Sequence, residues 1–168
     1  MNTFAYTLVS RGTEHKLKTM AKKNPLCVLM PVNQLSLDHW SLAIFVNVNG
    51  MLPQKGCGID VSAGMSILYL DSAFSANRKL HDNLQKIANV LRVAKGGKPE
   101  DKVVYPFYSE RLTLPQQLND KDCGFYVIEY VARFMHDPLQ VIGPGCVRHP
   151  EAHHLEANYF HLKDFERK

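Results

Sequence analysis

Three side chains that together could perform nucleophilic catalysis stand at the ends of segments with regular hydrophobic patterning. His39 directly precedes a long apolar run, Asp71 directly follows another, and Cys123 begins a helix-like segment. A thiol at a helix N-terminus lies at the positive end of the helix dipole, which favours the nucleophilic thiolate. A neighbouring imidazole can take the thiol proton, and a carboxylate on the far ring nitrogen can hold that imidazole in one tautomer.

Each of these residues also has an ordinary structural explanation. An isolated buried cysteine usually behaves as a small hydrophobic residue. His39 can simply pack beside Trp40, and an Asp-Ser pair after a strand is common in turns and helix caps. The order His, Asp, Cys favours a catalytic arrangement without deciding it.

The elements that must position these residues follow from hydrophobic periodicity. We expect strands at 26–32, 40–48, 66–70 and 103–105. We expect helices at 13–22, at 76–94 after an N-cap at Ser75, and at 123–135 after an N-cap at Asp122. A strand-rich middle flanked by helices predicts an α+β fold.

Two of the expected helices differ in their patterning. The helix at 76–94 carries one apolar stripe, formed by Leu80, Leu84, Ile87 and Leu91. The helix that begins at Cys123 has little polar surface, and we expect it to be largely buried. Its apolar residues are Phe125, Ile128, Val131, Phe134 and Met135.

Composition narrows the class of protein further. A chain of 168 residues with 45% hydrophobic and 21% charged residues is typical of one globular domain. The net charge of +4 comes from scattered basic residues, so we expect no nucleic-acid partner, although a weakly basic face suits an acidic protein. The four cysteines form no CxxC pair, and the first ten residues lack the features of a secretory signal. We therefore expect free thiols, no membrane association, and a location in the nucleus or cytoplasm.

One segment resembles the active-site signature of the SUMO-specific proteases, the ubiquitin-like-protein protease family. Residues 115–124 match every specified position of the pattern P-Q-Q-x-N-x-x-D-C-G. Residues 38–42 resemble the family's H-W-x-L element, and residues 69–72 resemble its D-S element. With the flanking similarity at 2–4 and 29–32, the resemblance covers about residues 2–136.

The resemblance implies a papain-like or adenain-like cysteine protease fold, in which the helix bearing the cysteine packs on a mixed β-sheet. It implies Cys123 as nucleophile, His39 as base, Asp71 as the residue that orients His39, and Gln117 as donor to the oxyanion. It also implies that Trp40 covers a narrow channel for a Gly-Gly tail, whereas a core anchor is the ordinary reading of a tryptophan. The implied substrate is a ubiquitin-like modifier, SUMO or a Nedd-type protein, either as a precursor or in conjugates. The enzyme is expected to be a monomer without metal or organic cofactor.

The sequence departs from the family pattern in two places. An extended loop at 49–63 stands where the family often has a tight hairpin. The family's W-L-N-D segment, which helps to bind the modifier, has no counterpart here. We therefore expect residues 1–168 to form a single catalytic domain without the usual front segment. This leaves open an alternative, a weakly active or inactive form that acts as a modifier-binding scaffold.

The C-terminal segment has superficial metal-ligand character. Cys146, His149, His153 and His154 are close in sequence, but their spacing is not that of a recurring four-ligand zinc site. We expect a solvated tail there and no metal.

Overall fold

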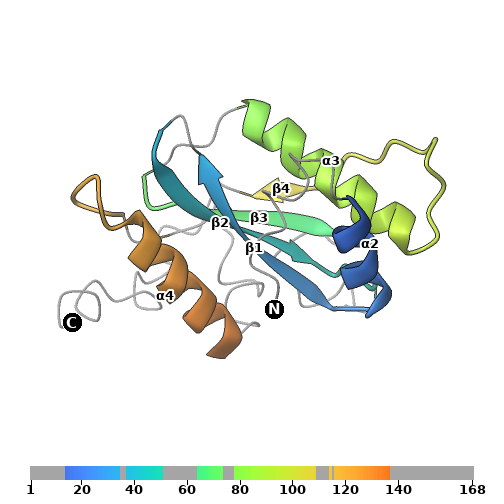
Figure 1. Cartoon of the computed structure of the whole chain (residues 1–168), viewed down its shortest axis with the longest axis horizontal. Coiled ribbons are helices and arrows are strands. Elements are labelled where there is room, and N and C mark those ends of the chain that lie inside the picture. The colour runs from blue at the N-terminus through green and yellow to red at the C-terminus, as the bar shows by residue number, and fades with distance from the viewer. Residues whose placement is uncertain are drawn as a thin grey trace, which may run out of the picture.

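The computed structural model describes residues 14–34, 37–50, 64–73, 78–108, 114 and 116–136. The helices in these ranges are α2 (Glu14–Lys22), α3 (Arg78–Ala94) and α4 (Cys123–His136). The strands are β1 (Cys27–Gln34), β2 (His39–Val46), β3 (Ser66–Leu70) and β4 (Phe107–Tyr108). Figure 1 shows the strands as a layer with α4 on one side and with α2 and α3 on the other.

The strands form one mixed sheet in the order β1-β2-β3-β4. Strand β2 pairs antiparallel with β1 and with β3, and β4 pairs parallel with β3. Alternate side chains of β2 enter two hydrophobic clusters: Leu42 and Ile44 pack with α4, and Ala43 and Phe45 pack with α2 and α3. Burial on both faces explains why β2 is a continuous apolar run. The predicted α+β architecture, with the Cys-bearing helix on a mixed sheet, is confirmed.

Helix α3 closes the face of the sheet opposite α4. Its predicted apolar stripe is buried in full, at Leu80, Leu84, Ile87 and Leu91. The helix ends where Gly96 adopts a φ of 95°, a conformation that costs glycine little because it lacks a Cβ atom.

The strand predicted at 103–105 is wrong. Strand β4 begins at Phe107, two residues after the end of the predicted strand, and there Phe107 aligns with Ile67 of β3. Residues Val103 and Tyr105 bond instead to side chains of α3. Asn89 Nδ2 donates to Val103 O at 2.8 Å, and Gln85 donates to Tyr105 O at 2.8 Å and accepts from Tyr105 N at 2.9 Å. The segment is therefore held by side-chain amides that take the place of a neighbouring strand.

The bounds predicted for α4 are nearly correct, but the prediction that it is largely buried is wrong. Residues Cys123, Tyr126, Val127, Tyr130 and Phe134 pack against the sheet. On its other face the side chains of Phe125, Ile128 and Met135 are 70%, 67% and 54% exposed. Within the described ranges no helix or strand packs against this second face. Sequence periodicity identified the apolar residues but not which of them have a neighbour.

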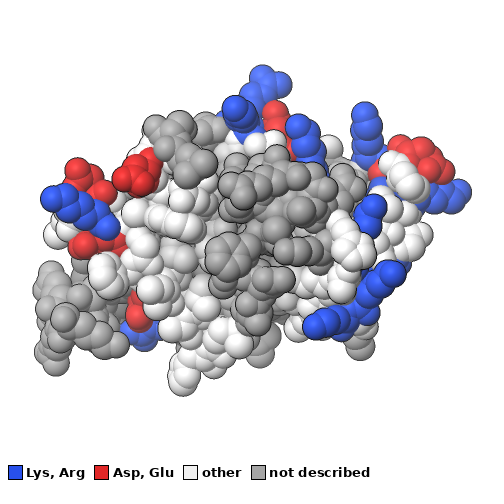
Figure 2. Space-filling model, viewed as in Figure 1, with Lys and Arg blue, Asp and Glu red and all other residues white. Residues whose placement is uncertain are grey.

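Charged side chains of both signs surround the face of the molecule seen in Figure 2. Lysine and arginine side chains project from its rim and are interrupted by acidic ones, without forming one continuous basic area.

None of the described helices is both long and apolar enough to cross a membrane. Five predicted features lie outside the described residues, namely the flanking similarity at 2–4, Ser75, most of the loop at 49–63, Pro115 and the His-rich C-terminal segment.

Candidate active site

His39 is placed by the turn that joins β1 to β2. Leu37 N donates to Gln34 O at 2.8 Å, and Asp38 adopts a φ of 47° immediately before the histidine. Aspartate tolerates this left-handed conformation better than most residues do, because its short side chain bonds locally. His39 then pairs with Gln34 as the first residue of β2, and its side chain is buried.

Asp71 reaches His39 because β3 runs antiparallel to β2. The last residue of β3, Leu70, pairs with Leu42, so the end of β3 lies beside the beginning of β2. Asp71 Oδ1 is 2.7 Å from His39 Nε2, and the two side chains are only 4% and 8% exposed. The carboxylate accepts from Nε2–H, which leaves the lone pair on Nδ1 as the basic site of the ring.

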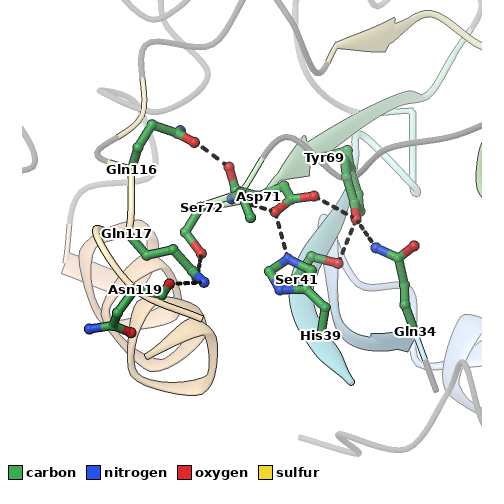
Figure 3. Close-up of polar contacts among 10 residues, drawn as sticks. Gln34, His39, Ser41, Tyr69, Asp71, Ser72, Gln116, Gln117 and Asn119 are labelled. Atoms are coloured by element: carbon green, nitrogen blue, oxygen red, sulfur yellow. Dashed lines mark hydrogen bonds and ion pairs between the residues drawn. The ribbon is translucent and has the colours of Figure 1, made fainter. Parts of the chain in front are cut away.

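A buried hydroxyl network fixes the other side of the carboxylate (Figure 3). Tyr69 Oη lies 3.2 Å from Asp71 Oδ2 and 2.7 Å from Ser41 Oγ. Gln34 Nε2 donates to the same hydroxyl at 3.1 Å. The backbone of Ala73 adds a bond to Asp71 Oδ1 at 2.8 Å. Asp71 is therefore held at both oxygens. The only sign of this network in the sequence is the polar residue types inside buried strands.

The segment at 116–117 is attached to the end of β3 and to α4. Gln116 Nε2 donates to Asp71 O at 3.3 Å, and Tyr126 of α4 donates to Gln116 O at 3.1 Å. Gln117 N donates to Ser72 O at 2.9 Å. These bonds bring Gln117, predicted as an oxyanion donor, next to the Asp71–Ser72 pair although 45 residues separate Ser72 from Gln117.

Cys123 is the first residue of α4 and is buried. The carbonyl of Asp122 accepts the first helical hydrogen bond, from Tyr126 N at 3.1 Å, so Asp122 occupies the predicted N-cap position. Asn119 shapes the preceding turn: its Oδ1 accepts from Lys121 N at 2.9 Å and from Asp122 N at 3.0 Å, and its Nδ2 donates to Asp122 Oδ2 at 2.7 Å. This turn directs the chain into the helix and places the thiol at its N-terminus.

The proposed triad is joined only on its acid side. His39 and Asp71 are hydrogen-bonded, but among the contacts of the described residues there is no hydrogen bond between Cys123 Sγ and the His39 ring. Bonds between nucleophile and base often tighten only when a substrate is bound.

Cys27 provides a contrast to Cys123. It is the first residue of β1, and burial raises the pKa of its thiol to about 11. A backbone hydrogen bond from Asn47 lowers this pKa, but its effect is smaller than that of burial. Such a thiol is inert near neutral pH. Of the two cysteines in the described ranges, only Cys123 has the helix N-terminal position expected of a nucleophile. Cys57 and Cys146 lie outside those ranges.

Trp40 is not a core anchor, because 39% of it is exposed. It follows His39 in β2 and, by strand alternation, shares the α4 side of the sheet with Leu42 and Ile44. Its predicted position over a channel for the substrate tail stays a prediction. In the described part of the chain no cluster of three or more His, Cys, Asp or Glu residues could hold a metal ion.

Solved structures of proteases resemble this fold. The chain has 22% identity and a TM-score of 0.61 to a de-sumoylating protease, covering 83% of this chain and 52% of that one. For the SUMO protease Ulp1 with its catalytic cysteine oxidised to a sulfenic acid, the values are 27% identity, TM-score 0.52, and 82% and 57% coverage. For the Ulp1 protease domain in complex with Smt3, the yeast ortholog of SUMO, the identity is 21% and the TM-score is 0.52, and the match covers 82% of this chain and 56% of that one.

The chain thus spans just over half the length of these structures. Among curated proteins, none is significantly similar to it in sequence. A family model does match, across residues 4–161, and these residues include His39, Asp71, Gln117 and Cys123. The chain belongs to the Ulp1 protease family and corresponds to its C-terminal catalytic domain.

Proposed function

We propose that this chain is a thiol protease that cleaves after the C-terminal Gly-Gly of a SUMO-like modifier. The observation that carries the proposal is the buried His39–Asp71 pair at 2.7 Å, in a chain whose family is a protease family and whose Cys123 begins a helix. Related structures support the substrate class, since one is a de-sumoylating protease and another is a complex with Smt3.

The proposed reaction begins with transfer of the Cys123 proton to His39 Nδ1, the ring nitrogen that does not contact Asp71. The thiolate attacks the carbonyl of the terminal glycine, and a Gln117 side-chain N–H and the backbone N–H of Cys123 stabilise the oxyanion. Collapse of this intermediate breaks the C–N bond, the imidazolium protonates the leaving amine, and a thioester remains on Cys123. His39 then activates a water molecule that hydrolyses the thioester. Every step uses side chains of this chain and water, so we propose no metal or organic cofactor.

The proposal covers processing of a modifier precursor and release of the modifier from target lysines, since both reactions break an amide bond after the same glycine. Trp40, partly exposed beside His39, is proposed to cover the Gly-Gly tail, because residues without side chains fit a narrow channel. We further propose that residues 1–168 act as one monomeric catalytic domain in the nucleus or cytoplasm, on SUMO in preference to a Nedd-type modifier.

One observation favours a second candidate function, a modifier-binding domain with weak or no activity. Among the described residues, no hydrogen bond joins the Cys123 thiol to the His39 imidazole in the absence of substrate. Such a form would retain the fold and bind the modifier without turning it over.

The experiment that separates the two functions is covalent capture by a modifier that carries a C-terminal vinyl sulfone. We expect a SUMO probe to form an adduct with the wild-type chain and with Cys27→Ser, a matched control that removes the inert thiol of β1. We expect none with Cys123→Ser, because a serine hydroxyl is far harder to ionise. A Nedd-type probe run in parallel tests the choice of modifier. Binding without an adduct in the wild-type chain would establish the second function, and an adduct on Cys123→Ser would refute the assignment of the nucleophile.

A further inference from the structure

Ser72 contacts Gln117 through both its backbone and its side chain. Gln117 N donates to Ser72 O at 2.9 Å, and Ser72 Oγ lies 2.6 Å from Gln117 Oε1. Ser72 is only 2% exposed and directly follows Asp71. One strand end thus carries the carboxylate that contacts His39 and the hydroxyl that contacts Gln117 (Figure 3).

The hydrogen bonds fix the orientation of the Gln117 amide. Its Nε2 lies 2.6 Å from the backbone oxygen of Asn119, which can only accept. The nitrogen must therefore face Asn119, and Oε1 must face Ser72, so that the serine hydroxyl is the donor. This arrangement uses one of the two hydrogens on Nε2 for Asn119, and no described residue uses the other, which can face a ligand.

We propose that Ser72 is a positioning residue for catalysis, which holds the Gln117 side chain so that its second N–H faces the developing oxyanion. The inference rests on the proposed function and adds a residue to which the motif reasoning assigned no role. An oxyanion donor is effective when it is oriented before the reaction, since reorientation during the reaction costs part of its stabilising effect. A hydrogen bond received at Oε1 also polarises the amide and strengthens its N–H as a donor.

A purely structural role for the Ser72 hydroxyl predicts a different result. Loss of a buried hydrogen bond lowers stability whether or not Gln117 takes part in the reaction. A positioning role acts only on the transition state, so it lowers kcat and leaves KM unchanged. It also disappears once the Gln117 amide is gone.

The test is a double-mutant cycle on the turnover of a SUMO–coumarin conjugate. We expect Ser72→Ala to lower kcat about tenfold with KM within about twofold, less than the roughly 10²- to 10³-fold fall expected for Gln117→Ala. In the Gln117→Ala background, Ser72→Ala should change kcat by less than about twofold. Ser66→Ala is the matched control, because it removes an equally buried hydroxyl at the other end of β3. Its kcat should equal that of the wild type, and thermal unfolding reports on folding of every variant.

Each other outcome overturns the inference. Ser72→Ala with unchanged kcat removes the positioning role. If Ser72→Ala lowers kcat equally in the wild-type and Gln117→Ala backgrounds, Ser72 does not act through Gln117. If Ser72→Ala raises KM and leaves kcat unchanged, Ser72 acts on substrate binding. A folded wild-type chain that forms no probe adduct and has no turnover overturns the proposed function together with this inference, which distinguishes that failure from the others.

Discussion

The side chain of Asp71 allows the role of its charge to be separated from its role in orienting His39. Its Oδ1 receives two hydrogen bonds, from His39 Nε2 at 2.7 Å and from Ala73 N at 2.8 Å. In an Asp71→Asn variant the amide oxygen must take this position, because an NH₂ group there would face the backbone N–H of Ala73. The NH₂ group then faces Tyr69 Oη, which can accept it and turn its own hydrogen to Ser41 Oγ, 2.7 Å away.

This orientation preserves the hydrogen bond from His39 Nε2–H and therefore the tautomer, and it removes only the negative charge. A hydrogen bond to a charged group contributes about 1.5–3 kcal/mol, against about 0.5–1.5 kcal/mol for a neutral one. The lower ends and the upper ends of these two ranges differ by about 1–1.5 kcal/mol, which corresponds to a fall in kcat of roughly 5- to 13-fold. Asp71→Ala removes the orientation as well, and we expect kcat to fall by about 10³- to 10⁴-fold.

The assay is steady-state turnover of a SUMO–coumarin conjugate by the wild type and both variants, with thermal unfolding to confirm that each is folded. Asp82→Asn, the same carboxylate-to-amide change at an exposed position of α3, serves as a control for the substitution chemistry. If Asp71→Asn lost as much kcat as Asp71→Ala, the amide would not present its oxygen to His39, and the reasoning from the Ala73 bond would be refuted.

Four further predictions concern the side chains of Gln117, Tyr69 and Cys27. Gln117→Ala should lower kcat by about 10²- to 10³-fold with little change in KM, and a change mainly in KM would make this residue a substrate-positioning group instead. Tyr69→Phe removes the hydroxyl between Asp71 and its neighbours and should destabilise the protein by about 1–3 kcal/mol in urea unfolding, whereas an unchanged midpoint would show that the network adds no stability. With a pKa of about 11, Cys27 is about 0.1% thiolate at pH 8, so peptide mapping after brief iodoacetamide treatment should find label on Cys123 before Cys27. Because folding raises the pKa of the Cys27 thiol, the neutral thiol contributes fully to the free energy of unfolding below its ordinary pKa. That contribution is lost as the pH rises through 11. The free energy of unfolding of Cys27→Ser should therefore fall less between pH 8.5 and 11 than that of the wild type.

The sequence predicted those parts of the fold that depend on local pattern. Strand β3 and the stripe of α3 have the predicted residues, and Cys123 begins α4 as its N-cap at Asp122 indicated. The error at Val103 arose because an extended apolar segment can bond either to a strand or to side chains. Here the amides of α3 took that place, and no local pattern reveals such a partner.

The sequence predicted the residue types of the candidate site and the contact of Asp71 with His39, but not the further contacts that hold these side chains. The motif identified His39, Asp71, Gln117 and Cys123, and the structure brings His39 to Asp71 and Gln117 to the end of β3. The contacts of Tyr69 depend on which strand faces it across the sheet, and this register is a tertiary property. The exposed face of α4 was missed for a related reason, since hydrophobicity alone does not show whether a partner is present.

The order of the elements along the chain has a consequence for the nascent protein. Strands β1, β2 and β3 each pair with the next strand in sequence, so the surroundings of His39 and Asp71 are synthesised together. Cys123 follows Asp71 by about 50 residues, which at translation rates of about 5–20 residues per second is a delay of roughly 3–10 seconds. During that interval the growing chain contains the proposed general base but not the proposed nucleophile. We therefore expect a ribosome-bound chain stalled before Cys123 to be unable to cleave, and the proposed activity to arise only once α4 has been made and has packed against the finished sheet.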